Sequence, residues 1–134
     1  MTSTTGVIRR LVGVYHADGG LRGELAYLIG KVRGTTSCAL CDVTHHAVGR
    51  KREWRDLLPD LGVPVDLVHL NERSPAVRAA SEGRTPCMLA VTDGGLVLLL
   101  GPDELAALNG SVTGFAEALR AAATLAGLRW DAVR

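Results

Sequence analysis

The chain has 134 residues, of which 47% are hydrophobic and 22% are charged, and its formal net charge is +1 at pH 7. This composition is typical of a globular chain that buries a core without disulfide staples, and we expect one domain over 1–134. The charges are balanced and interspersed, which argues against nucleic acid as a partner, and no apolar run is long enough to cross a bilayer.

The first residues give an expectation for the cellular compartment. Residues 1–6 are polar, and Arg9 and Arg10 interrupt the first apolar run, which is not the order of a signal peptide. We therefore expect a cytoplasmic protein, in which thiols stay reduced. The three cysteines then indicate catalysis, redox chemistry or metal binding rather than a disulfide framework.

The first half of the chain predicts two strands separated by two helices. The run from Val7 to Tyr15 is nearly continuously apolar from Leu11, which favours a strand buried on both faces. Apolar residues at helical spacing then predict the two helices, before a second run of β-formers. The predicted elements are strand 7–15, helix 21–32 ended by Gly34, helix 47–58 ended by Pro59 and Gly62, and strand 63–70.

Cap and turn signals are clearer in the second half. Ser74 before Pro75 is a helix start, with a serine N-cap and a proline in the first turn. Asp93-Gly94 between two apolar runs predicts a β-hairpin. The predicted elements are helix 75–83, strands 85–91 and 96–100, a short helix 103–108, a last helix with Val112, Phe115, Leu119, Ala122 and Leu125 on its buried stripe, and a tail over 127–134 from which Trp130 folds back.

The most informative stretch runs from Cys38 to His46 and contains two cysteines and two histidines in nine residues. Cys38 and Cys41 form a C-x-x-C pair, which either closes a small disulfide or binds one soft metal ion. His45 suits both uses, as a further ligand or as a cation that lowers the pKa of a thiol. The alternative is that both cysteines are small apolar residues packed in a core.

The order of the predicted elements resembles the thioredoxin-like fold, an α/β fold whose mixed four-stranded sheet is flanked by helices. The resemblance covers residues 7–126, and its most specific part is Thr85-Pro86 opening a strand that turns at Asp93-Gly94. It implies a cis peptide bond before Pro86, beside an active dithiol. In that family the C-x-x-C pair directly follows the first strand, whereas here it follows the first helix.

This topology predicts that several reactive residues meet at one edge of the sheet. His16 ends the first strand and His69 ends a second strand parallel to it, so both lie at the same edge. The third strand is antiparallel and begins there with Pro86 and Cys87. A second helix that starts at this edge brings Cys38, Cys41 and His45 to it as well.

Three functional hypotheses follow. Two of them use the cysteines chemically, and in the third the chain is an interaction module with incidental cysteines. In the leading one, a thioredoxin-like thiol–disulfide redox protein, one C-x-x-C cysteine attacks a protein or small-molecule disulfide and the other resolves the mixed disulfide. No cofactor is then required, Thr85 and Pro86 hold the substrate, and Cys87 is either a third redox thiol or a buried packing residue. In the alternative, a metal protein binds zinc, copper or iron. Its ligands are drawn from Cys38, Cys41, His45, Cys87, His16 and His69, and the oligomeric state stays open in both hypotheses.

Overall fold

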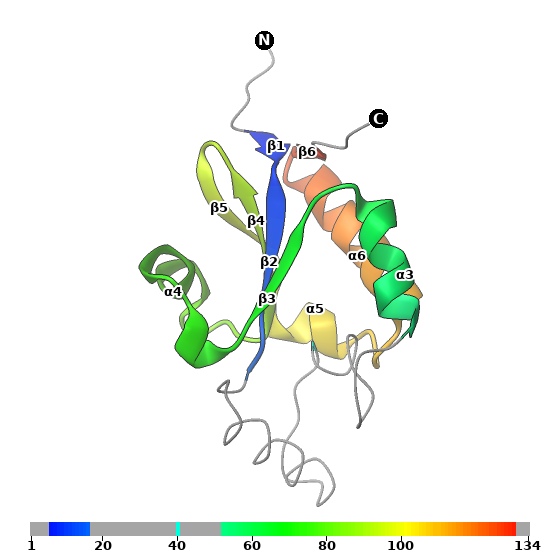
Figure 1. The fold of residues 1–134 in the computed structure, drawn as a ribbon, viewed down its shortest axis with the longest axis horizontal. Coiled ribbons are helices and arrows are strands. Elements are labelled where there is room, and N and C mark those ends of the chain that lie inside the picture. The colour runs from blue at the N-terminus through cyan, green and yellow to red at the C-terminus, as the bar shows by residue number, and fades with distance from the viewer. Residues whose placement is uncertain (1–5, 17–39, 41–51, 131–134) are drawn as a thin grey trace, which may run out of the picture.

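The computed structural model describes residues 6–16, 40 and 52–130. Within these ranges a four-stranded sheet has the order β3-β2-β4-β5 (Figure 1). Its strands are β2 (Arg10–Val14), β3 (Val65–Val68), β4 (Cys87–Thr92) and β5 (Gly95–Leu100). β3 is parallel to β2, whereas β4 is antiparallel to both β2 and β5. The protein is therefore an α/β protein with a mixed four-stranded sheet, as the sequence predicts.

Helices cover both faces of this sheet. α3 (Arg52–Leu61) and α6 (Val112–Leu125) lie on one face, and the shorter α4 (Pro75–Ser81) lies on the other (Figure 1). α5 (Pro102–Ala106) follows β5. The predicted helix 21–32 and the start of the predicted helix 47–58 fall outside the described residues. No helix in the described ranges is long and apolar enough to span a membrane.

The two faces enclose separate apolar cores, because successive side chains of a strand point to opposite faces. The larger core lies on the α3 and α6 face and includes Leu11, Leu40, Trp54, Phe115 and Leu119. The Trp54 and Phe115 rings meet edge-to-face there, with their centroids 5.4 Å apart. The smaller core lies on the α4 face and consists of Val12, Val14, Cys87 and Leu89, with partly buried residues of α4 and β5 against it.

The strongest local signals in the sequence act as predicted. Ser74 caps α4, since its side chain accepts a hydrogen bond from the backbone N–H of Val77 at 3.2 Å. Pro75 occupies the first turn of that helix, where its missing N–H costs nothing. Asp93 and Gly94 form the two-residue turn between β4 and β5.

Two expectations about helices are wrong. Pro59 does not end α3, which continues to Leu61 before Gly62 adopts a positive φ of 77°. Pro59 lies in the last turn and is exposed, so its ring interrupts only the end of the hydrogen-bond ladder. Leu125, predicted on the buried stripe of α6, is 89% exposed because Ala123 instead turns toward the core at that end of the helix.

Three expectations about strands also need correction. The predicted strand 7–15 is two strands, β1 (Val7–Ile8) and β2, because β1 leaves the main sheet. β1 pairs in parallel with β6 (Arg129–Trp130), so residues 129–130 are not a tail, and Trp130 packs against the larger core as expected. The predicted strand 63–70 is regular only over β3, and Leu70–Glu72 instead forms a short 3-10 turn.

Candidate functional site

The described candidate residues gather at one edge of the sheet, where β2 and β3 end and β4 begins. Val14, the last residue of β2, is paired with Val68 on one side and with Cys87 on the other. His16 and His69 follow these strand ends, and Thr85-Pro86 leads into β4. The predicted convergence therefore holds for the members that the structure describes, and we call this place the His16 edge.

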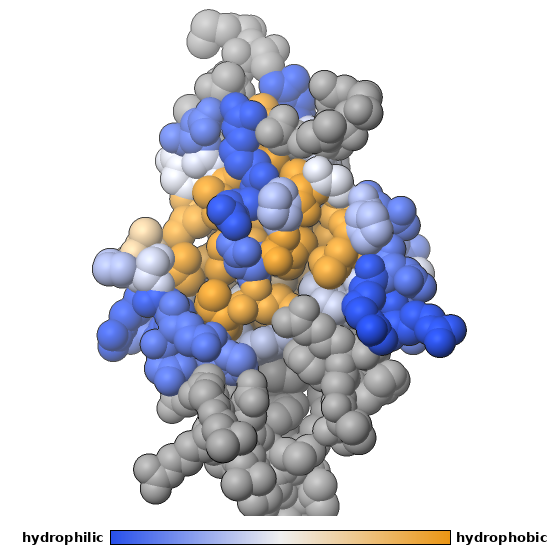
Figure 2. Space-filling view, viewed as in Figure 1, coloured by the Kyte–Doolittle hydropathy of each residue, from blue (hydrophilic) through white to orange (hydrophobic). Residues whose placement is uncertain are grey.

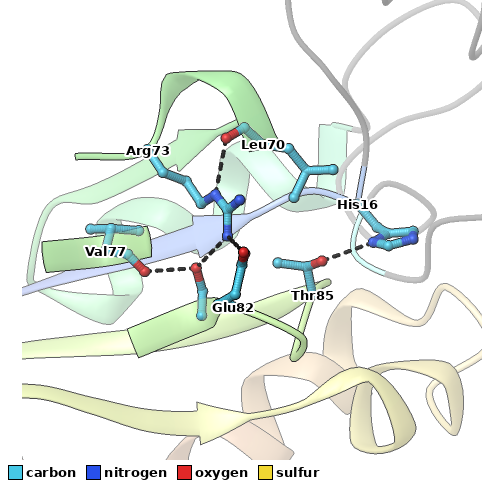
Figure 3. Close-up of polar contacts among 7 residues, drawn as sticks. His16, Leu70, Arg73, Val77, Glu82 and Thr85 are labelled. Carbon is cyan, nitrogen blue, oxygen red and sulfur yellow. Dashed lines mark hydrogen bonds and ion pairs between the residues drawn. The ribbon is translucent and has the colours of Figure 1, made fainter. Parts of the chain in front are cut away.

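His16 and Thr85 are joined across this edge. The Nδ1 atom of His16 lies 2.8 Å from Oγ1 of Thr85, at hydrogen-bonding distance (Figure 3). The Thr85–Pro86 peptide bond is cis, as the resemblance implied, and Pro86 is buried while Thr85 is half-buried. The contact links the end of β2 to the residue that precedes β4.

His69 is held in place from two sides. Its ring lies 5.0 Å from that of Tyr15, centroid to centroid. Its backbone N–H and its Nδ1 atom both lie 2.8 Å from Oε1 of Glu72, and the carboxylate can only accept, so both nitrogens donate. These two hydrogen bonds from His69 lower the pKa of the Glu72 carboxyl. Sequence reasoning missed Glu72, although its position three residues after His69 is the spacing of a capping box.

Arg73 was also missed, and only 8% of its side chain is exposed. Its Nε donates to the carbonyl of Leu70 at 2.9 Å, and one terminal nitrogen donates to Oγ of Ser81 and to Glu82, each at 3.1 Å (Figure 3). The Ser81 hydroxyl in turn donates to the carbonyl of Val77. Arg73 thus ties the turn after β3 to the far end of α4. No pattern around Arg73 marks it as a buried arginine.

Cys87 lies at this edge but is fully buried in the smaller core. Burial raises the pKa of its thiol to about 11, and the nearby charges of Arg73 and Arg84 only partly oppose this. A thiol with such a pKa is protonated at neutral pH and is a poor nucleophile and metal ligand. The structure therefore favours the packing interpretation of Cys87 over the redox one.

Cys38, Cys41 and His45 lie outside the described residues, but Leu40 does not. Leu40 is fully buried in the larger core. A Cβ atom built on Gly13 of β2 would lie 3.2 Å from Cδ2 of Leu40, so the two residues are neighbours. The Cys87 side chain belongs to the smaller core on the opposite face, which places the sheet between Cys87 and Leu40.

The described residues alone do not assemble a metal centre. Among them, no three or more histidine, cysteine, aspartate or glutamate side chains form a group able to hold an ion. His16 and His69 each make a hydrogen bond through Nδ1, to Thr85 and Glu72 respectively. The metal alternative depends on Cys38, Cys41 and His45, and it stays a prediction.

Comparison of the chain with family models, with curated proteins and with solved structures found no match. A functional assignment therefore rests on the chemistry of the His16 edge. The His16 edge carries the imidazole of His16, the hydroxyl of Thr85 and the carboxylate of Glu72, which accepts from His69. These groups are suited to binding and to proton transfer. The one described thiol of this edge is not activated.

Proposed function

We propose that this chain is a thioredoxin-like thiol–disulfide redox protein whose reactive pair is Cys38 and Cys41. The thiolate of one cysteine attacks a substrate disulfide, forms a mixed disulfide and expels one substrate thiolate, which takes up a proton. The second cysteine then attacks the mixed disulfide and expels the other substrate thiol. The substrate gains two electrons and two protons, and the protein is left with a Cys38–Cys41 disulfide.

The observation that carries this proposal is the junction at the His16 edge. A parallel strand pair, followed by an antiparallel strand that opens with Thr85-Pro86, is the arrangement that the thioredoxin-like resemblance implies. Helices also flank the sheet, as that fold implies, with α3 and α6 on one face and α4 on the other. The His16–Thr85 contact places an imidazole next to the residue expected to hold the substrate.

The burial of Leu40 supports a role for the C-x-x-C pair at this place. Leu40 directly precedes Cys41, and its side chain packs beside Gly13, three residues before His16 on the chain. In the sequence Leu40 stands between Cys38 and Cys41, so the C-x-x-C stretch includes one residue that is attached to the larger core.

The decisive experiment traps the mixed disulfide. The Cys87→Ala protein serves as the background, because Cys87 is assigned to packing and is kept out of the reaction. Cys38→Ser and Cys41→Ser are introduced into it separately and incubated with a disulfide-bonded protein substrate. Only the variant that keeps the attacking cysteine is expected to accumulate a mixed disulfide, and that cysteine should alkylate fastest at neutral pH.

Slow alkylation of both cysteines in the reduced, metal-free protein, with no mixed disulfide from either variant, would contradict the proposal. Thiols that stay protected until a chelator is added, with loss of protection in His45→Ala, would instead support the metal alternative. Elemental analysis of the purified protein separates these outcomes directly.

A further inference from the structure

The two edges of the central sheet differ in how they are protected. β3 has four residues, and the exposed Asp66 in the middle of the strand forms an ion pair with Arg10. Figure 2 views the molecule from the β3 side, where hydrophilic residues cross an apolar area. β5 has six residues, Gly95–Leu100, with no charge and no proline. Charges on an edge strand are a common device against pairing with another chain, and β5 lacks it.

The backbone of β5 is open on one side in the part of the chain that the structure describes. β5 pairs with β4 and with no other described strand. Alternate residues of such a strand direct their N–H and C=O groups away from the sheet, where they can bind another strand. The open side of β5 is distinct from the His16 edge, because the His16 edge lies at the ends of the strands.

Apolar side chains lie beside this open backbone. Leu98 is 36% exposed and is paired with Leu89 of the smaller core, which puts it on the α4 face. Leu96 packs against the same core and is only half-buried, as is its partner Val91. α4 has seven residues, too few to cover the whole of this face.

We propose that β5 pairs with β5 of a second copy of this chain, antiparallel and about a two-fold axis, to join two four-stranded sheets into one. An uncharged strand matches another uncharged strand, and in this arrangement residues at even spacing share a face. Leu96 and Leu98 of one copy then lie beside Leu98 and Leu96 of the other. Such an interface uses the same patch twice and closes as a dimer.

Charges at the two ends of β5 favour the antiparallel direction. Arg9 pairs with Asp93 at 3.0 Å where β5 begins, so that end carries no net charge. Asp103 and Glu104 lie in the first turn of α5, three and four residues after β5 ends at Leu100. Antiparallel pairing places the neutral end of one copy beside the acidic end of the other and so keeps the two acidic ends apart.

The irregularity of the hairpin limits the strength of the dimer. The register between β4 and β5 shifts between Met88 and Leu89, opposite the last residues of β5. A bulge twists an edge strand and interrupts regular pairing. Regular pairing is therefore expected over Leu96–Leu98, and such a small interface predicts a weak dimer that dissociates on dilution.

The test is sedimentation of the full chain over a concentration series, with a reducing agent present so that intermolecular disulfides do not form. The wild-type chain should shift from monomer to dimer as its concentration rises. Leu98→Lys places a charged side chain against the apolar Leu96 of the other copy, on both sides of the two-fold axis, and should raise the dimer Kd by about tenfold or more. Leu125→Lys makes the same change at an 89% exposed leucine of α6 and should leave the Kd unchanged.

Amide hydrogen exchange provides a second readout that needs no substitution. Outward-facing amides within Leu96–Leu98 should exchange more slowly as the wild-type concentration rises, while those of β3 should not change. A wild-type chain that stays monomeric at every concentration would overturn the proposal. So would a dimer with the same Kd in a folded Leu98→Lys variant, or a dimer that Leu125→Lys weakens as much.

Discussion

On the α3 and α6 face of the sheet, fifteen buried residues of the described chain form the larger core, whereas four form the smaller core on the α4 face. The larger core is built from apolar packing, which includes the edge-to-face contact of the Trp54 and Phe115 rings. The smaller core is covered by one short helix, which Arg73 holds through hydrogen bonds to Leu70, Ser81 and Glu82. One face therefore depends on buried apolar volume, and the other depends partly on polar anchors close to the His16 edge.

The largest expected effect tests whether the larger core carries most of the stability. Phe115→Ala removes a fully buried ring and should lower the free energy of unfolding by about 3–5 kcal/mol. Leu89→Ala empties a fully buried site in the smaller core, where the thin cover can collapse, and should cost about 2–3 kcal/mol. Urea unfolding of both variants measures the difference. An equal or larger loss for Leu89→Ala would remove the contrast between the faces.

The smaller core should show its own pH dependence through Cys87. Burial raises the pKa of this thiol from 9.0 to about 11, so the folded state keeps its proton after the unfolded state has lost it. The stabilisation is fully present below pH 9 and is lost as the pH rises from about 9 to 11. The loss amounts to about 3 kcal/mol at 1.4 kcal/mol per pKa unit. The free energy of unfolding, measured at several pH values in this range, should fall more steeply with pH in wild type than in Cys87→Ala. An equal fall in both proteins would contradict the prediction.

A smaller effect tests how tightly the larger core closes over β2. A Cβ added at Gly13 would lie 2.7 Å from Cδ2 of Leu67 and 2.9 Å from Sδ of Met88, so neighbouring side chains must move. Gly13→Ala should therefore destabilise the protein by about 1–2 kcal/mol, after the entropy gained by replacing glycine. Gly6→Ala is the matched control, because its nearest neighbour is the Gly127 carbonyl at 3.7 Å. Thermal unfolding measures the stability of both variants. An equal loss of stability in the two would mean that the side chains around Gly13 can move aside at little cost.

The smallest effect concerns the turn that leads from β3 to α4. Glu72→Gln weakens the two hydrogen bonds from His69, and the loss should stay below about 1 kcal/mol because the carboxylate is half exposed. The pKa of Glu72 is lowered in the folded state, so its contribution is present at neutral pH and disappears as the pH falls below the ordinary glutamate range. The stabilities of Glu72→Gln and wild type should accordingly converge in acid, as measured by urea unfolding at several pH values.

The fold was predictable where a local signal and the long-range packing agree. Ser74-Pro75 starts a helix and Asp93-Gly94 makes a turn through short-range chemistry, and both are found where the sequence places them. Pro59 and Leu125 were misjudged because their environments are decided by position in the helix and by what packs nearby. The pairing of β6 with β1 joins residues far apart in the sequence, and two-residue strands carry no periodic signal.

The site was predictable as a place and not as a set of contacts. Strand directions alone brought His16, His69 and Thr85-Pro86 to one edge. The bond between His16 and Thr85, and the burial of Arg73, depend on side-chain geometry that no spacing reveals. For Cys87 the sequence left a redox thiol and a packing residue both open, and its burial favours packing.

The parallel pairing of β1 with β6 has a practical consequence. Val7 lies beside Arg129 and Ile8 beside Trp130, so the two ends of the described chain leave the molecule from the same place. That place is at the end of β2 opposite His16 (Figure 1). A reporter domain fused to either terminus would lie at the end of the sheet opposite the His16 edge. A sensor surface tethered there would likewise leave the His16 edge accessible to substrates.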